Sequence, residues 1–180
     1  MATPIPSNQA TFTLGEIAQA TGAVHDGSDG RAIRGIATDS RADLHGKLFV
    51  ALCGDRFDGH EYLQDAAARG AAAVLVERDD VPELPVPALR VPSTLGALGD
   101  IAHRHRQKWR GRVVAVVGSA GKTTTRVAIE TVLGASLGPR VHATRGNLNN
   151  QIGVPMTLLV GSPGSVLWSC TSRYEMSVRP

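Results

Sequence analysis

Aromatic side chains are scarce in this sequence, since Phe, Trp and Tyr make up only 4% of its 180 residues. A chain so poor in aromatics lacks the stacking platforms on which proteins bind single-stranded nucleic acid. The net charge is only +3, and the arginines are scattered instead of forming a stripe. Both features argue against a nucleic acid as partner, because nucleic-acid-binding domains concentrate positive charge on one face.

Cysteines are few, and long apolar runs are missing. The two cysteines, Cys53 and Cys170, have neither metal-ligand spacing nor a disulfide framework, which is typical of a reducing compartment. No apolar run is long enough to span a membrane, and residues 1–12 lack the basic and apolar regions of a secretory signal. These absences predict a cytoplasmic protein without membrane insertion, and residues 1–12 are expected to form a flexible leader.

What remains is the composition of a globular protein, 42% hydrophobic and 19% charged. Short apolar runs alternate with stretches that suit helices, which is the signature of an α/β fold. The predicted strands are 33–38, 47–52, 71–77, 88–91, 113–117 and 141–144. The predicted helices begin after Thr13, near Asp58, after Ser93, after the turn at 118–121 and near Pro155.

Several helix boundaries carry their own signals. Thr13 and Glu16 have the spacing of a capping box, and Gly22 is the expected end of the helix that they begin. Gly70 is the expected C′ residue of the second helix. A domain boundary fits near 109–112, where the chain passes into the next predicted strand.

The stretch 113–125, VVAVVGSAGKTTT, organises the rest of the chain. An apolar β-branched run predicts a buried strand, and the turn after it ends in Gly-Lys-Thr. Glycine lets backbone N–H groups approach an anion, and the following helix N-terminus adds free donors and a positive dipole. Only two residues separate the glycines, so the turn is a shortened P-loop. The predicted nucleotide-binding residues are Gly118, Ser119, Ala120, Gly121, Lys122, Thr123 and Thr124.

A simpler alternative is an ordinary strand–turn–helix connection, in which Gly, Lys and Thr only begin a helix. The strand before the turn and the helix-compatible stretch after it favour phosphate binding. Lys122 can then reach the terminal phosphates, and the Thr123 hydroxyl can ligate Mg²⁺.

Other polar stretches allow both a structural and a functional interpretation. Asp39-Ser40-Arg41 is either a polar turn or a hydroxyl and guanidinium presented to an anionic ligand, and the residues alone favour the turn. The loop 146–155 holds three asparagines and is either an Asx-rich turn or a set of carboxamides near the phosphate site. His103 and His105 lie two apart on a predicted helix, so we interpret them as surface or packing residues.

Several segments in one order resemble the Mur ligases, the ATP-dependent amide-forming enzymes of peptidoglycan precursor synthesis. They are TDSR at 38–41, GKLFVALCGDRFDGHEYL at 46–63, ARGAAAVLVE at 68–77 and GSAGKTTT at 118–125. The shortened P-loop is the form that this family uses. TRGNLNNQIGVPMTLL at 144–159 is most similar to the branch of the family that adds D-alanyl-D-alanine.

The resemblance implies a small N-terminal α/β substrate domain followed by the first part of a P-loop-type, parallel-sheet ATP-binding domain. Residues 13–110 would bind a UDP-muramoyl-peptide, and residues 111–180 would form an incomplete central ATP-binding domain without the C-terminal ligase domain. The implied substrates are UDP-N-acetylmuramoyl-tripeptide and D-alanyl-D-alanine, with ATP and Mg²⁺. ATP would phosphorylate the terminal carboxylate of the tripeptide, and the amine of the dipeptide would attack that acyl phosphate. We expect a cytoplasmic monomer.

The resemblance also implies roles for single residues. Lys122 would bind the β- and γ-phosphates, and Thr123 would ligate Mg²⁺. Asn147 matches a family position near the reacting carboxylate and phosphate. Ser40 and Arg41 match a segment that contacts the nucleotide-sugar substrate.

After Leu159 the sequence departs from the family. The family continues with an apolar strand that ends in a Mg²⁺-binding glutamate, whereas here the polar stretch 168–173 is expected to interrupt that strand. Glu175 is the candidate metal ligand, with an exposed tail carboxylate as the alternative. We interpret the break as a frameshift or truncation near Ser165 and expect that the chain alone does not complete catalysis.

Three alternatives remain from the residues and the resemblance. One is the branch of the same family that adds the third peptide residue. Another is a non-catalytic module that binds a UDP-sugar-peptide and keeps a vestigial nucleotide loop. The third is a P-loop NTPase of other function, which the N-terminal motifs disfavour.

Overall fold

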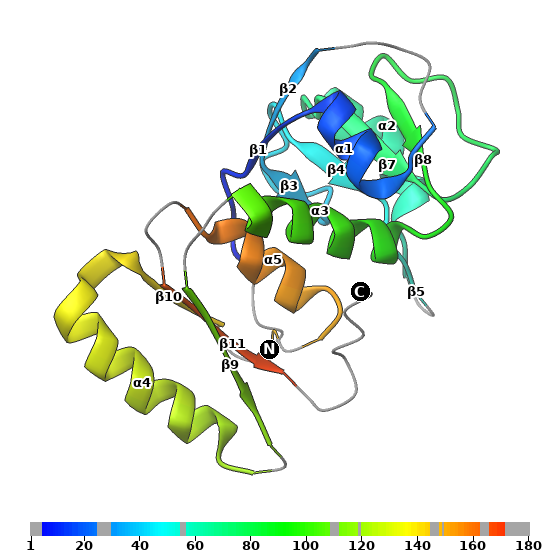
Figure 1. Cartoon of the computed structure of the whole chain (residues 1–180). Helices are drawn as coiled ribbons and strands as arrows, with labels where there is room; N and C mark the ends of the chain where they lie inside the picture. The colour runs from blue at the N-terminus through cyan, green and yellow to red at the C-terminus, as the bar shows by residue number, and fades with distance from the viewer. Residues whose placement is uncertain are drawn as a thin grey trace. The chain divides into compact units, whose positions relative to one another are not determined.

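The computed structural model describes residues 5–24, 30–54, 57–108, 112–118, 120–144, 148, 150–162 and 166–171. The chain divides into two compact units (Figure 1). The first unit is Ser7–Arg104, and the second is His105–Pro180 together with the first six residues.

A four-stranded parallel sheet forms the centre of the first unit. Its order is β3 (Ile36–Ala37), β4 (Leu48–Val50), β7 (Ala73–Val76) and β8 (Ala88–Arg90). Every residue of β4 and β7 is buried, as expected for parallel strands that are covered on both faces. The strands predicted at 47–52, 71–77 and 88–91 are therefore confirmed.

Three helical regions accompany this sheet: α1 (Leu14–Thr21), η1 (Gly59–Tyr62) with α2 (Leu63–Ala68), and α3 (Thr94–Lys108). The capping box at the start of α1 is present, and Gly22 ends the helix in the left-handed region with φ 68°. The helix predicted from Asp58 begins with a 3₁₀ turn before it becomes α-helical. Leu63 of α2 packs in one apolar cluster with Phe49 of β4 and Val74 of β7.

The strand predicted at 33–38 is wrong as a single element. Residues Ala32–Arg34 form β2, which pairs antiparallel with β1 (Thr11–Thr13), whereas β3 belongs to the four-stranded sheet. Gly35 separates the two strands with φ +106°, a backbone conformation that favours glycine. A Cβ at this position would also lie 2.7 Å from the carbonyl oxygen of Asn8.

The prediction of a flexible leader at residues 1–12 is wrong for its last residues, which are packed before α1 begins. Asn8, Ala10 and Phe12 are buried, and β1 begins at Thr11. The Asn8 carboxamide donates to the carbonyl oxygen of Ile36 at 2.9 Å and accepts from its N–H at 3.0 Å. This side chain therefore takes the place of a neighbouring strand beside β3, which a polar N-terminal sequence does not reveal.

The second unit contains a three-stranded parallel sheet with the order β10, β11, β9. These strands are β10 (Val141–Ala143), β11 (Val166–Thr171) and β9 (Arg112–Val117), and α4 (Lys122–Leu137) and η2 (Gly138–Arg140) connect β9 to β10. Helix α5 (Gly153–Val160) precedes β11, and α4 and α5 lie on opposite faces of the sheet (Figure 1).

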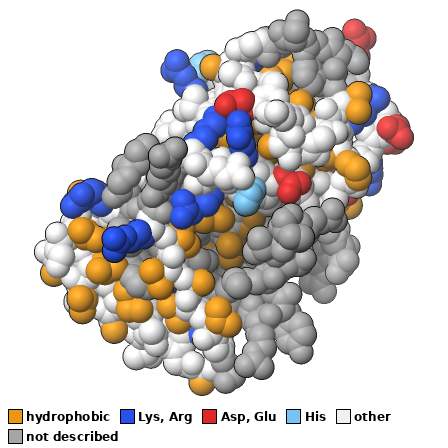
Figure 2. Space-filling view, viewed as in Figure 1, with side chains coloured by type: hydrophobic (Ala, Val, Ile, Leu, Met, Phe, Trp, Pro, Cys, Tyr) orange, Lys and Arg blue, Asp and Glu red, His pale blue; other side chains and the backbone are white. Residues whose placement is uncertain are grey.

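Two expectations about this sheet are corrected. Residues Trp168–Thr171 do not interrupt the strand but continue β11: all four pair with β9, and Trp168 also pairs with β10. The last two residues of the predicted interruption, 172–173, lie outside the described residues. Trp and Thr favour strands, and the ladder to β9 pairs the backbone throughout this stretch. Strand β9 is an edge strand of this sheet and is not fully buried: Val114 and Val117 are exposed, as are Val127 and Val132 of α4. Figure 2 shows hydrophobic side chains gathered over the region of α4.

No helix in the described part of the chain is long and apolar enough to cross a membrane.

Candidate functional site

The predicted P-loop is a turn between a strand and a helix. β9 ends at Val117, Gly121 takes φ +76° as the N-cap residue of α4, and the helix begins at Lys122. The Lys122 ammonium donates a hydrogen bond to the carbonyl oxygen of Gly118, so its side chain folds back over the turn. Ser119, another predicted nucleotide-binding residue, lies outside the described residues.

The start of α4 fits an anion. Among the described residues, no side-chain cap is recorded at this helix end, and its first turn holds no acidic residue. The N–H groups of the first turn therefore remain available as donors, and the helix dipole adds positive potential at the same place. Lys122, Thr123 and Thr124 stand in this turn, in the order that phosphate and metal binding require.

A carboxylate cage for a metal ion is absent from the part of the chain that the structure describes, since no three His, Cys, Asp or Glu residues gather there. A magnesium ion held by one hydroxyl and by nucleotide phosphates needs no such cage. The Thr123 hydroxyl is the group here that fits this role. Glu175, the candidate metal ligand of the tail, lies outside the described residues.

Arg126 links the P-loop helix to the end of β10. Its guanidinium donates to the carbonyl oxygen of Thr144 at 2.8 Å and pairs with Glu130 at 3.2 Å. Thr144 directly precedes the loop that contains Asn147, which itself lies outside the described residues. The sequence analysis missed Arg126, although its position one helical turn after Lys122 is a usable signal.

The asparagine-rich loop is a structural turn at its end. Asn150 Oδ1 accepts from the N–H groups of Ile152 and Gly153, at 3.2 and 2.7 Å, and so begins α5. A Cβ at Gly153 would lie 2.5 Å from the Leu148 backbone, and Leu148 is buried. The Asx-turn interpretation therefore holds for Asn150, and the role of Asn147 stays a prediction.

The segment after β3 is the polar turn that its residues favoured. Asp39 Oδ1 accepts from both the backbone N–H and the Nε of Arg41 at 2.9 Å, and Oδ2 pairs with the guanidinium at 2.9 Å. Ser40 is buried, whereas the Arg41 side chain is 84% exposed. Hydrogen bonds from Arg41 lower the pKa of Asp39, and Asp39 first, then the nearby Tyr62, raise the pKa of Arg41.

Four polar segments follow the four strands of the parallel sheet at their carboxyl ends. Asp39–Arg41 follows β3, the hairpin of β5 (Cys53–Gly54) and β6 (Phe57–Asp58) follows β4, Glu77 and Arg78 follow β7, and Ser93 and Thr94 follow β8. Ligands of parallel α/β sheets bind at this edge. The edge of the first unit is therefore the candidate substrate site.

An exposed aromatic pair lies on the segment after β4. The rings of Phe57 and Tyr62 stack with centroids 5.6 Å apart and an angle of 11° between their planes. Phe57 is 47% exposed and Tyr62 is 38% exposed. Tyr62 lies near the Arg41 guanidinium. A flat apolar surface near this positive charge suits a ligand that combines a planar ring with negative charge.

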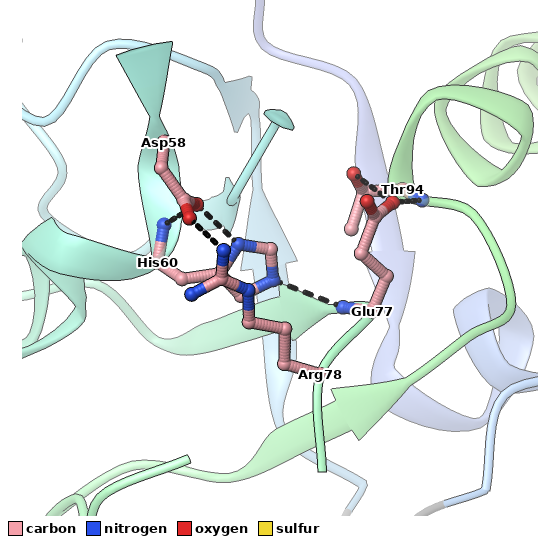
Figure 3. A network of polar contacts seen from close by, with 5 residues as sticks. All are labelled: Asp58, His60, Glu77, Arg78 and Thr94. Atoms are coloured by element: carbon pink, nitrogen blue, oxygen red, sulfur yellow. Dashed lines mark hydrogen bonds and ion pairs between the residues drawn. The ribbon is translucent and has the colours of Figure 1, made fainter. Parts of the chain in front are cut away.

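Five residues at the same edge of the sheet form a network of polar contacts (Figure 3). Asp58 accepts from the backbone N–H of His60 at 2.9 Å, lies 2.7 Å from its Nδ1, and pairs with Arg78. The Nε2 of His60 accepts from the N–H of Glu77 at 3.1 Å. The Glu77 carboxylate accepts from the N–H and hydroxyl of Thr94, at 2.7 and 2.9 Å, at the start of α3.

Burial opposes the ionisation of Asp58, but hydrogen bonds from His60 and the positive charge of Arg78 outweigh it and lower the pKa of this carboxyl group. The network ties the ends of three strands together. The sequence analysis assigned no role to His60, and its position two residues after Asp58 was the one available signal of a local contact.

His105 is a packing residue, as predicted. Its Nε2 lies 2.7 Å from the carbonyl oxygen of Gly161, and burial lowers its pKa.

A parallel α/β unit, joined to a strand, a glycine turn and a helix that begins at lysine, defines a P-loop-type α/β protein. Comparisons with known proteins agree with this class. A family model described as "Mur ligase family, catalytic domain" matches residues 32–106. The UDP-N-acetylmuramoyl-tripeptide–D-alanyl-D-alanine ligase of Bacillus subtilis (strain 168) is 46% identical over 129 residues, which are 71% of this chain and 28% of the relative.

Solved structures give the same result. A crystal structure of MurF from Acinetobacter baumannii matches with a TM-score of 0.78 and 33% identity, over 94% of this chain and 37% of that chain. The structure of MurF ligase from Thermotoga maritima in complex with ADP matches with a TM-score of 0.67 and 32% identity, over 76% of this chain and 31% of that chain. In sequence and in structure, the chain is similar to Mur ligases. It spans less than two fifths of the length of these relatives.

Proposed function

We propose that this chain provides the substrate-binding unit and the P-loop of a MurF-type ligase. Such an enzyme uses ATP to join D-alanyl-D-alanine to UDP-N-acetylmuramoyl-tripeptide in the cytoplasm. In this proposal residues 13–110 bind the UDP-muramoyl-tripeptide, and residues 111–180 contribute the first part of the ATP site. The proposal includes that the protein is a monomer.

The observation that carries the proposal is the geometry at the start of α4. An uncapped helix N-terminus, a left-handed glycine at Gly121 and the ammonium of Lys122 converge on one turn. Because no side-chain cap is recorded here in the described part of the chain, these N–H donors are available for the phosphates of ATP. ATP supplies the phosphoryl group that converts a carboxylate into a good electrophile.

The residues of this chain have three tasks in that chemistry. Backbone N–H groups of 118–124 hold phosphate oxygens, and Lys122 moves from the Gly118 carbonyl oxygen to the terminal phosphates. Thr123 supplies a hydroxyl ligand to Mg²⁺. Asn147 orients the reacting carboxylate, and Ser40 and Arg41 hold the nucleotide-sugar end of the substrate.

Calorimetric titration of the purified chain with UDP-N-acetylmuramoyl-tripeptide and with Mg-ATP tests this proposal. We expect both to bind, and we expect Lys122→Ala to weaken Mg-ATP by at least about tenfold while leaving the nucleotide sugar unaffected. The matched control is Lys108→Ala, which removes a lysine at the end of α3. Failure of the nucleotide sugar to bind would contradict the assignment of the first unit.

A phosphate-release assay separates the remaining alternatives. Release from Mg-ATP that depends on both the tripeptide substrate and D-alanyl-D-alanine identifies the MurF-type ligase and contradicts the expectation that the chain alone does not complete catalysis. Release with UDP-N-acetylmuramoyl-dipeptide and an amino acid identifies the branch that adds the third residue. Binding of the nucleotide sugar without any binding of Mg-ATP identifies a module with a vestigial nucleotide loop.

A further inference from the structure

His60 is a buried histidine that is bound through both of its ring nitrogens (Figure 3). Its side chain is only 5% exposed. Because the Glu77 N–H can only donate, Nε2 of His60 must be without a proton to accept from it at 3.1 Å. The neutral ring then carries its proton on Nδ1, which faces Asp58 Oδ1 at 2.7 Å.

The groups around the ring have opposite effects on its charge. The Asp58 carboxylate, on β6, favours a proton on Nδ1, and Arg78, after β7, offsets part of that negative charge. The Glu77 N–H opposes a second proton on Nε2, since two donors would then face each other. The Glu77 carboxylate is bound to Thr94 and does not take part in this contact.

The two bonds of His60 connect segments that are distant in sequence. Asp58 and His60 belong to the hairpin and 3₁₀ turn after β4, whereas Glu77 lies at the carboxyl end of β7, seventeen positions further along the chain. Phe57 and Tyr62, the exposed stacked pair, flank Asp58 and His60 on the same segment. The contact from His60 to Glu77 therefore fixes where this pair lies at the carboxyl edge of the sheet.

We propose that His60, as the neutral Nδ1–H form, is a positioning residue that latches the 57–62 segment to the sheet so that the Phe57–Tyr62 stack meets the nucleotide-sugar end of the substrate. This inference rests on the proposed function for the site and adds to it a residue and a protonation state. Protonation of Nε2 breaks the bond to Glu77 and releases the segment, while the apolar core beneath it stays packed. The substrate then binds less tightly as the solution becomes more acidic.

Nitrogen-15 NMR of the intact chain tests the latch without any substrate. Spectra are recorded at a series of pH values from pH 8 downwards. We expect the imidazole shifts of His60 to show the Nδ1–H tautomer at pH 8, and the Glu77 amide signal to move together with them as the pH falls. An Nε2–H tautomer, or a Glu77 amide that does not follow His60, would overturn the proposal.

Binding of UDP-N-acetylmuramoyl-tripeptide, measured by calorimetry from pH 8 to pH 5.5, tests the consequence. In the wild-type chain we expect the affinity to fall by about tenfold, the equivalent of one lost hydrogen bond. His60→Gln keeps an acceptor on the Nε2 side but takes up no proton, so its affinity should stay within about threefold of wild type at pH 8 and lose this decline. His60→Phe keeps the ring volume without either bond and should bind about tenfold more weakly at every pH.

His45→Gln is the matched control, because His45 is an exposed histidine of the same unit. It should retain the pH dependence of the wild-type chain, including any part that comes from the substrate. If His60→Gln declines with pH as steeply as His45→Gln does, the latch is wrong and the proposed function stands. If the wild-type chain does not bind the nucleotide sugar at pH 8, the proposed function fails, and the tautomer measurement still decides the state of His60. If His60→Phe does not fold, the pH dependence of binding is compared between His60→Gln and the wild-type chain.

Discussion

Asn8 and Ile36, 28 positions apart, are joined by two hydrogen bonds between one carboxamide and one backbone residue, at 2.9 and 3.0 Å. The side chain completes the free side of β3 as a neighbouring strand would. Edge strands with unpaired N–H and C=O groups pair readily with other chains, so this contact also protects the sheet.

Asn8→Ala should lower the free energy of unfolding by about 1–3 kcal/mol, because it leaves the N–H and C=O of Ile36 without a partner in a buried place. Urea denaturation followed by circular dichroism measures this change. Gln9→Ala, at the exposed neighbouring position, is the control and should change stability by less than about 0.5 kcal/mol. Equal effects of the two substitutions would show that the carboxamide has no special role.

Gly59→Ala should destabilise the first unit by about 1–3 kcal/mol, since its Cβ would lie 2.8–2.9 Å from backbone atoms of Ala51 and Leu52. Gly99→Ala offers the matched control within α3, where nothing lies within 4 Å of the added atom. There alanine should stabilise the helix by up to about 1 kcal/mol. Thermal melts of both variants decide the prediction, and it is contradicted if the two variants shift in the same direction.

Asp58→Asn should remove a pH-dependent part of the stability. The pKa of Asp58 is lowered in the folded chain from its usual 3.8, so the carboxylate stabilises the fold above that value. This contribution is lost as the pH falls from about 4 through the lower folded-state pKa. Unfolding free energies from pH 7 to pH 3 should therefore differ between wild type and variant at pH 7 and converge at low pH. Asp100→Asn, on the exposed side of α3, should show no such convergence.

Gly121→Ala should strain the P-loop, because a side chain at φ +76° costs about 1–2 kcal/mol in the left-handed region. We expect weaker Mg-ATP binding, by about fivefold or more, together with lower stability. Gly134→Ala, further along the same helix, meets nothing within 4 Å and should stabilise α4 without changing the affinity for Mg-ATP. An unchanged affinity in Gly121→Ala would contradict the role of this turn.

The elements that local patterns define could be predicted from the sequence. The capping box of Thr13 and Glu16, the end of α1 at Gly22 and the strand–turn–helix around Gly121 all depend on neighbours in sequence, and all are present. Contacts between distant residues carry no such signal. The Asn8 bridge is an example, because an asparagine near the N-terminus looks the same whether it is solvated or buried.

The candidate sites also divide into one that local sequence signals and one that depends on contacts between distant residues. Lys122 stands in a local strand–glycine–helix motif, so the position of this turn could be predicted from the sequence, and its binding of phosphate stays a prediction. The network around His60 could not, since it needs Glu77 and Thr94, which only the pairing of β7 with β8 brings to it. The break in β11 was predicted from side-chain polarity, whereas the pairing of its backbone with β9 along its whole length determines that strand.

The order of strands in the second unit has a consequence for how the chain folds during synthesis. β11 is last in sequence but lies between β9 and β10, so neither of these strands has a partner in this sheet until residue 171 has left the ribosome. The first unit can already fold by then, because its sheet is complete at Arg90. During this interval the valines of β9 are exposed on an unpaired strand, which makes the nascent P-loop region the part of the chain where we expect chaperones to bind.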